Sequence, residues 1–127
     1  MRALIQRVSE SHVKVAQKTV GDIGTGLCIF IGIADSDTDK DINYIVDKIV
    51  NLRIFPNSEG KFDLSAMDIN AELLIISQFT LYANTNKGRR PSFIRSAHPE
   101  KAKVVFEDVI NKFIATGLKV QTGTFQQ

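Results

Sequence analysis

The stretch ELLIISQFTLY at residues 72–82 begins as a continuous apolar run and then changes character. A run that is apolar on both faces is typical of a strand covered on both sides of its sheet. We therefore predict a core strand over residues 71–82. Its second half contains Ser77, Gln78 and Thr80, which a buried strand rarely carries together, and no cysteine or histidine lies nearby in the sequence. The end of this strand is the first candidate for a functional site.

The rest of the sheet is expected from similar patterns along the chain. A second apolar run, GLCIFIGIA at residues 26–34, predicts another central strand. Shorter segments with alternating or extended patterns predict the remaining strands: residues 2–8, 12–16, 19–23, the two sides of a turn at 56–60, and 118–125.

Two segments change to the period of an amphipathic helix. In residues 38–53 the apolar side chains recur at helical spacing, and Asp37 or Thr38 can cap the start. In residues 98–117, Pro99 fits the first helical turn and the buried stripe is expected at Ala102, Val105, Phe106, Val109 and Phe113. The order of elements predicts an α/β sandwich or curled sheet with mixed strand pairing and helices on one face.

Size and composition fit a folded intracellular domain. The chain has 127 residues, enough for one domain over residues 1–127, with 43% apolar and 24% charged residues. No apolar run is long enough to span a bilayer, and the N-terminus lacks the apolar core of a signal peptide. The single Cys28 cannot form an internal disulfide, so we expect a cytoplasmic protein with no membrane contact.

Charge is balanced in total but uneven along the chain. The net charge is +2, too small to indicate nucleic-acid binding by itself. The loop NKGRRPSFIR at residues 86–95, however, holds Lys87, Arg89, Arg90 and Arg95 and no acidic residue. Arginine donors beside Phe93 are typical of a phosphate and base contact, although the same loop could be only a solvated one.

Other candidate sites find little support. Cys28 lies among apolar neighbours and is expected to be a packed core cysteine. The acidic DSDTDKD at residues 35–41 lacks the glycine and glutamate of a calcium loop, so we expect a solvated helix start. The two histidines, His12 and His98, have no metal-ligand spacing, and a serine–histidine–aspartate triad through Ser77 or Thr80 has little in its favour. An enzyme built this way would need a reaction that requires little acid–base help.

Two adjoining motifs carry a resemblance to a known family. SQFTLYA at residues 77–83, followed by KGRRPSF at 87–93, is similar to the signature of the D-aminoacyl-tRNA deacylases. The likeness covers essentially the whole chain, in the same order, through MRALIQRVSESHVKV, VGDIGTGLCIFIGIADSDTDKD, KIVNLRIF, GKFDLS and VQTGTF. The resemblance implies that family's fold, an α/β domain with a curled, mixed and barrel-like sheet and two main helices packed on the outside.

The resemblance also implies an activity. Members of the family hydrolyse the ester of D-aminoacyl-tRNA, and of glycine wrongly attached to tRNA, as proofreading in translation. They are homodimers with sites at the subunit interface, bind the tRNA 3′ end, and need no metal or organic cofactor. Without the resemblance, the alternatives are a non-catalytic RNA- or DNA-binding module that uses the basic 87–95 loop, or an inactive scaffold.

The site residues follow from the same resemblance. Ser77, Gln78, Phe79 and Thr80 would line the pocket, with the main-chain amides of Phe79 and Thr80 receiving the substrate. Thr80 is expected to position these donors rather than to act as a nucleophile, since the family's chemistry is assigned to the terminal 2′-OH of the tRNA. Substrate binding would involve residues from the first strand and the basic loop: Arg7, Phe79, Lys87, Arg89, Arg90, Pro91, Ser92 and Phe93.

One family motif is missing. The family carries an Asn-x-Gly-Pro-x-Thr segment whose Gly-Pro excludes L-amino acids, whereas this chain has prolines only at 56, 91 and 99 and no Gly-Pro. Either the motif follows Gln127 in a longer protein or the native chain is truncated, which would remove the element that selects against L-amino acids. We expect the first, because a chain that stops inside a core strand would leave sheet edges unpaired.

Overall fold

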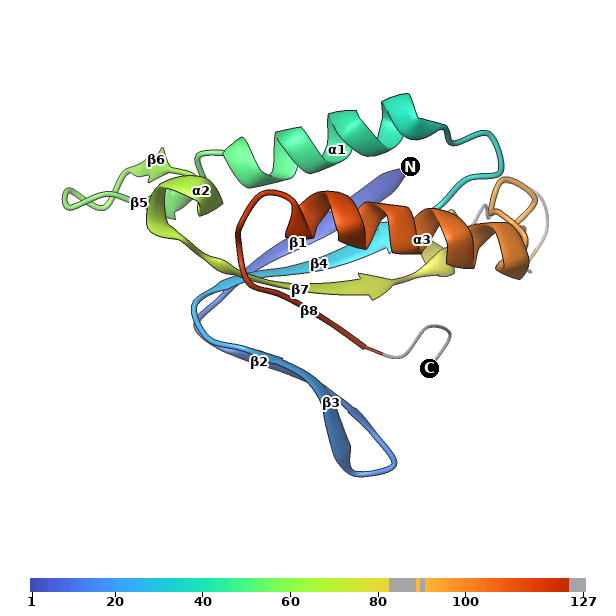
Figure 1. Ribbon diagram of the computed structural model, residues 1–127, viewed down its shortest axis with the longest axis horizontal. Helices are drawn as coiled ribbons and strands as arrows, with labels where there is room; N and C mark the ends of the chain where they lie inside the picture. Colours follow the sequence, from blue (N-terminus) through green and yellow to red (C-terminus); the bar gives the residue numbers. More distant parts are fainter. Residues whose placement is uncertain (83–88, 90, 124–127) are drawn as a thin grey trace.

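The computed structural model describes residues 1–82, 89 and 91–123, which form one mixed sheet, two smaller strand pairs and helices (Figure 1). The main sheet has the order β1-β4-β7-β8. Its strands are β1 (Arg2–Val8), β4 (Gly26–Gly32), β7 (Glu72–Ser77) and β8 (Val120–Thr122). β1 is antiparallel to β4, whereas β4, β7 and β8 are parallel. The mixed pairing predicted from the order of elements is therefore confirmed.

Two long helices cover one face of this sheet. α1 (Asp39–Asn51) and α3 (Pro99–Ile114) lie side by side over the strands in Figure 1. Their apolar stripes, which include Ile49 and Phe113, pack against alternate side chains of the two central strands in the main core, such as Ile29 and Ile75. Each fully buried side chain of this size contributes about 1.5–3 kcal/mol. The helices predicted from the 3.6-residue period are thus present. They pack on one face of the sheet and form a single hydrophobic core with it.

The opposite face of the sheet is covered by a β-hairpin. β2 (Ser11–Val15) and β3 (Lys18–Ile23) pair with each other, and β3 contacts β7 and β8. The intervening side chains of the central strands, Cys28 and Leu74, pack there against Ile23 in a second, smaller cluster. The two central strands are therefore buried on both faces, as their uninterrupted apolar sequences predict.

The remaining elements are short. β5 (Phe55–Pro56) and β6 (Phe62–Leu64) flank the predicted turn, and α2 (Ala66–Ile69) is a single turn that the sequence patterns did not indicate. α2 is fixed by a capping box in which Ser65 and Asp68 exchange hydrogen bonds of 2.9 and 3.1 Å. No helix within the described ranges is long and apolar enough to cross a bilayer.

One strand is shorter than predicted. The strand predicted over 71–82 ends at Ser77, and Phe79–Tyr82 forms a 3₁₀ turn, η1. The strand ends here because its partner β4 ends at Gly32. The last main-chain hydrogen bond between the two segments is donated by Gln78 N–H to Ile31 O at 2.8 Å. The acidic segment 35–41 leads into the start of α1, and Asp35, Asp39 and Asp41 are exposed as predicted, whereas Asp37 is only 8% exposed. The strand predicted at 118–125 is seen at Val120–Thr122, and its last two residues lie outside the described part.

Candidate functional site

A cavity of about 510 Å³ opens where β7 ends. Its walls come from segments far apart in the sequence: the end of β7 with η1, the loop after β4, the segment before α3, and the first turn of α3. The lining residues are Ile33, Asp35, Ser77, Phe79, Phe93, Ile94, Ser96, Ala97, His98, Pro99 and Ala102. Two sequence motifs predicted separately, SQFTLY and RPSF, thus meet in one site.

An aromatic pair forms one side of the cavity. The rings of Phe79 and Phe93 meet edge to face, with centroids 5.0 Å apart and planes at 63°. Phe79 is 59% exposed, unusual for so large an apolar side chain, while Phe93 is half-buried. An exposed ring that is held in place by a second ring offers a face on which a nucleobase can stack.

Main-chain donors are available beside the pair. Among the residues that the structure describes, the N–H groups of Phe79 and Thr80 have no acceptor, because they begin η1 and lie beyond the last ladder bond. An N–H group without a protein partner binds water or a ligand oxygen. As far as the described residues go, the two donors that the family resemblance assigns to substrate binding are therefore unpaired.

The hydroxyl of Thr80 has an amide as its neighbour. Gln78 Nε2 donates a hydrogen bond of 2.6 Å to Thr80 Oγ1, and Thr80 itself is exposed. A carboxamide is not a base, so this contact orients the hydroxyl without activating it as a nucleophile. The geometry fits a positioning role for Thr80.

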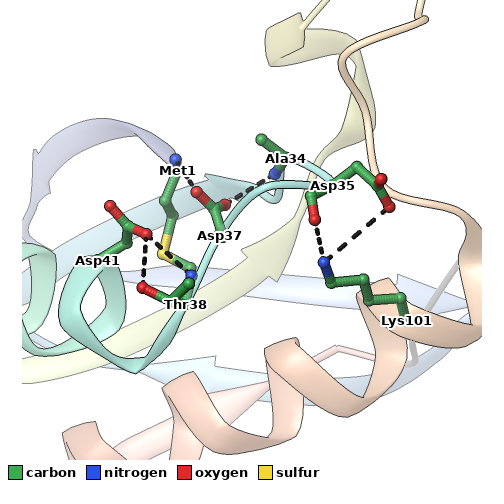
Figure 2. Close-up of polar contacts among 7 residues, drawn as sticks. All are labelled: Met1, Ala34, Asp35, Asp37, Thr38, Asp41 and Lys101. Atoms are coloured by element: carbon green, nitrogen blue, oxygen red, sulfur yellow. Dashed lines mark hydrogen bonds and ion pairs between the residues drawn. The ribbon is translucent and has the colours of Figure 1, made fainter.

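The loop after β4, which contributes Asp35 to the cavity lining, is held by a buried carboxylate (Figure 2). Asp37 accepts hydrogen bonds from the Met1 amino group at 2.6 Å and from Ala34 N–H at 2.7 Å. Lys101, from α3, donates to Asp35 O and lies 4.0 Å from the Asp35 carboxylate. These contacts hold the loop after β4 between the N-terminus and α3, so the part of the cavity lining that Asp35 forms is fixed from two sides.

The loop after β4 and the segment before α3 are joined by main-chain contacts. Ala34 and Ser96 form an isolated antiparallel bridge, and Ala97 N–H donates to Ile33 O at 2.9 Å. His98 is the N-cap of α3 and also lines the cavity. Sequence reasoning did not place Asp35 or His98 in the site, because no local pattern reports which loops meet in space.

Some predicted site residues lie elsewhere. Arg7 pairs with Leu27 at the other end of the sheet, donates to Ile54 O at 2.8 Å and covers the Phe62 ring at 4.9 Å. β1 runs antiparallel to β4, whereas β7 runs parallel to β4. The start of β1, and not Arg7 near its end, therefore lies at the same edge of the sheet as the carboxyl end of β7. Arg7 therefore does not line the cavity within one chain, and its part in substrate binding stays a prediction.

The basic loop is described only in part. Arg89, Pro91 and Ser92 are exposed, as a contact surface requires, whereas Lys87 and Arg90 lie outside the described residues. The role of these five residues in substrate binding stays a prediction.

The sole cysteine is a core residue, as predicted. Cys28 is buried, and burial raises the pKa of its thiol, with a hydrogen bond to Ser11 opposing the shift. A raised pKa keeps the thiol protonated and unreactive. The described part of the chain also contains no cluster of three histidine, cysteine, aspartate or glutamate side chains with metal-binding geometry.

Comparisons with known proteins identify the family of the chain. Residues 4–127 match the family described as D-Tyr-tRNA(Tyr) deacylase. Relatives named D-aminoacyl-tRNA deacylase include one from Aquifex aeolicus, 52% identical over 98% of this chain and 84% of its own length. Another, from Thermosipho africanus, is 51% identical over the same shares of the two chains.

Two solved structures are similar as well. One, titled c-Myc DNA Unwinding Element Binding Protein, has a TM-score of 0.92 at 35% identity and covers 98% of this chain and 85% of its own. The other, titled as a probable eukaryotic D-amino acid tRNA deacylase, has a TM-score of 0.84 over 98% of this chain and 88% of its own; at 17% identity it supports the fold alone. By sequence match over nearly its whole length, this chain is a member of the D-Tyr-tRNA(Tyr) deacylase family.

Proposed function

We propose that this chain hydrolyses the ester that joins a D-amino acid to the 3′ end of a tRNA. Membership of the family and relatives at about 50% identity named for this activity support the reaction. The structural observation that carries the proposal is the cavity itself. It has an aromatic pair, the exposed Phe79 and the half-buried Phe93, beside two main-chain donors without acceptors among the described residues.

The aromatic pair suits the terminal adenosine of the tRNA. Stacking of a base on an aromatic side chain is worth about 1–3 kcal/mol and tolerates any base, which matches a substrate end common to all tRNAs. With the adenine on Phe79, the ribose and its ester would lie next to the N–H groups of Phe79 and Thr80. Arg89 and Arg95 would then attract the phosphates of the preceding nucleotides.

The two donors suit the chemistry. When water adds to the ester carbonyl, negative charge develops on the carbonyl oxygen, and a preorganised N–H group stabilises it; loss of one such donor typically costs about 3–4 kcal/mol. Collapse of the intermediate breaks the bond to the ribose 3′ oxygen, which takes a proton. The protein has to orient the ester and hold the oxyanion, and neither task needs a histidine or cysteine.

The proton transfer is assigned to the substrate. The 2′-OH of the terminal ribose lies next to the ester. Binding the ribose in a fixed geometry holds this hydroxyl close to the reacting carbonyl, and this proximity lowers the barrier to the proton transfer. The Thr80 hydroxyl accepts a hydrogen bond from the Gln78 amide, and no base contacts it in the part of the chain that the structure describes. A tRNA that ends in 2′-deoxyadenosine should therefore bind but be hydrolysed far more slowly than its ribose counterpart.

The direct test compares D-tyrosyl-tRNA with L-tyrosyl-tRNA, incubated with the protein in the presence of a metal chelator. Release of D-tyrosine well above the spontaneous rate is the expected result. Tight binding of both tRNAs without release would contradict the proposal and favour a binding module. Neither binding nor release would favour a scaffold.

Three finer points extend the proposal. The family resemblance implies that glycyl-tRNA is also a substrate, that the protein works as a homodimer, and that it acts in the cytoplasm where aminoacyl-tRNAs are made. The exposed Leu4 on the edge strand β1 and the exposed Phe62 beside Arg7 are surfaces that a second copy could cover. Light scattering of the purified protein tests the dimer, and a glycyl-tRNA release assay tests the substrate.

A second candidate function is DNA binding. It is favoured by the similar structure whose title names a DNA unwinding element binding protein. Binding of single-stranded DNA with an affinity equal to that for tRNA, and no ester release, would support it. Competition in the release assay separates the two: DNA that only shares the basic loop should inhibit weakly and in a salt-dependent manner.

A further inference from the structure

The start of β1 contacts the cavity wall without lining the cavity. Arg2 pairs with Gly32, the last residue of β4, and its Nη1 donates a hydrogen bond of 2.7 Å to Leu81 O in η1. Carbonyl groups at the end of a short helix lack partners within it. The guanidinium therefore supplies a donor that η1 itself cannot.

The same guanidinium covers an aromatic ring in η1. Arg2 Cζ lies 4.5 Å from the centroid of the Tyr82 ring, within the range of a cation–π interaction. Tyr82 is only 4% exposed, so the ring is a fixed part of the structure and not a mobile surface group. The Arg2 side chain thus contacts η1 twice, at the main chain of Leu81 and at the side chain of Tyr82.

A second arginine reaches this ring from the other cavity segment. Arg95 Cζ lies 5.6 Å from the Tyr82 centroid, and Arg95 follows Phe93 by two residues. Burial, and next the charge of Asp37, raise the pKa of Tyr82, while the charges of Arg2 and Arg95 oppose the shift, so the ring stays a neutral phenol. Tyr82 therefore links the segment that carries Phe79 to the segment that carries Phe93.

The close approach of η1 depends on Gly32. A Cβ atom at this position would lie 2.8 Å from Leu81 Cβ and 3.2 Å from Tyr82 Cδ2. The absence of a side chain lets η1 settle on the end of β4, within reach of Arg2. The sheet, η1 and the segment before α3 are thereby joined at one point.

We propose that Arg2 is a positioning residue for the substrate: with Tyr82 and Arg95 it forms a clamp that holds the Phe79 ring against the Phe93 ring. This inference rests on the proposed function, because it assigns the aromatic pair to the terminal adenosine. The Tyr82 clamp, meaning Arg2, Tyr82 and Arg95, has no contact with the ester. It acts through the main chain of η1, which also carries the Phe79 and Thr80 N–H groups that have no acceptor within the described ranges.

The test compares four full-length proteins: wild type, Arg2→Met, Arg2→Lys and the control Arg53→Met. Met keeps the apolar stem and removes the charge and the hydrogen bond, and Lys restores a cation and a donor. Arg53 has a 74% exposed side chain and is paired with Asp63 at 3.7 Å, away from the cavity. We measure KM and kcat for D-tyrosyl-tRNA, the affinity for AMP as a probe of the adenosine seat, and the NMR shifts of the Phe79 and Phe93 ring protons.

Arg2→Met should raise KM and weaken AMP binding about 10- to 100-fold, with kcat changed less, because displacement by about 1 Å can cost a factor of 100. The ring proton shifts should move toward those of free phenylalanine. Arg2→Lys should recover most of the loss, and Arg53→Met should match wild type. If Arg2→Met does not fold, Arg2→Gln, which keeps an amide donor, serves in its place.

Wild-type values of KM, AMP affinity and ring shifts in Arg2→Met would overturn the clamp. Equal losses in Arg2→Met and Arg53→Met would also overturn it, since they would report general destabilisation. Failure of the proposed function looks different. In that case wild type releases no D-tyrosine, while the ring shifts still respond to Arg2→Met and support the clamp.

Discussion

The two halves of residues 72–82 have opposite surroundings. Leu73, Leu74 and Ile75 are 0% exposed and paired on both sides, with β4 and with β8. Phe79, four residues further, is 59% exposed, and its N–H has no acceptor among the described residues. The first half is scaffold and the second half is site. The comparison shows that main-chain N–H groups become available for binding where β7 ends and loses its neighbouring strand, directly after a buried part of the sheet.

The largest effect is expected in the scaffold half. A Cβ atom on Gly26 would lie 1.7 Å from Glu72 O, between backbones that cannot yield. Gly26→Ala should therefore lower the free energy of unfolding by at least about 3 kcal/mol, measured by urea denaturation. Gly24→Ala is the matched control, because its nearest contact would be an ordinary 3.6 Å, and it should change stability by less than about 1 kcal/mol. Equal stabilities would refute the close pairing of β4 and β7.

The site half should respond in activity and not in stability. Phe79→Ala removes an exposed ring, so the free energy of unfolding should change by less than about 1 kcal/mol. The value of kcat/KM for D-tyrosyl-tRNA should fall about 10- to 100-fold, the worth of one base stack. Tyr44→Ala, which removes a 69% exposed ring on α1, should leave kcat/KM unchanged. A Phe79→Ala protein that unfolds readily but keeps its activity would reverse the assignment of the two halves.

A smaller effect on turnover is expected when the Thr80 hydroxyl is removed. Thr80→Ala leaves both main-chain donors in place and removes only the acceptor for Gln78 Nε2. Turnover should fall by about 10-fold or less, since an unactivated hydroxyl contributes orientation rather than bond formation. Steady-state kinetics with a parallel tRNA-binding measurement checks this. Near-complete loss of turnover with unchanged binding would make Thr80 the nucleophile.

The smallest effect concerns the first residue of the scaffold half. The Glu72 carboxylate accepts a hydrogen bond of 2.8 Å from Gly24 N–H, which, with Lys119 nearby, lowers the pKa of Glu72. A pKa that is lower in the folded state stabilises the protein above the unfolded value, near 4.3, and this stability is lost as the pH falls through the folded value.

Urea midpoints at pH 7 and pH 3.5 measure the effect. Glu72→Gln should show a smaller fall in stability between the two values than wild type. Asp41 and Asp68, whose pKa values are lowered by hydrogen bonds with Thr38 and Ser65, should retain their share of the pH dependence. An identical fall in both proteins would mean that the Gly24 bond does not distinguish the folded from the unfolded state.

Local patterns in the sequence were sufficient for the scaffold. Apolar runs identified the two central strands, and the helical period identified α1 and α3, because burial on one or both faces leaves a periodic record in the chain. The end of β7 was harder to predict. A strand pattern continues through Phe79 and Leu81, but the strand stops at Ser77 where its neighbour β4 ends.

The sequence by itself determined the fold class and pointed to Ser77–Thr80 and Phe93, since hydrophobic spacing and the two motifs are written along the chain. Only the tertiary structure decided which residues surround them. It brought Asp35 and His98 into the cavity, buried Asp37 against Met1, placed Arg7 at the far end of β1 and Arg2 beside Tyr82. The physical reason is that strand direction and loop closure set neighbours across the chain, and no residue carries that information in its own local pattern.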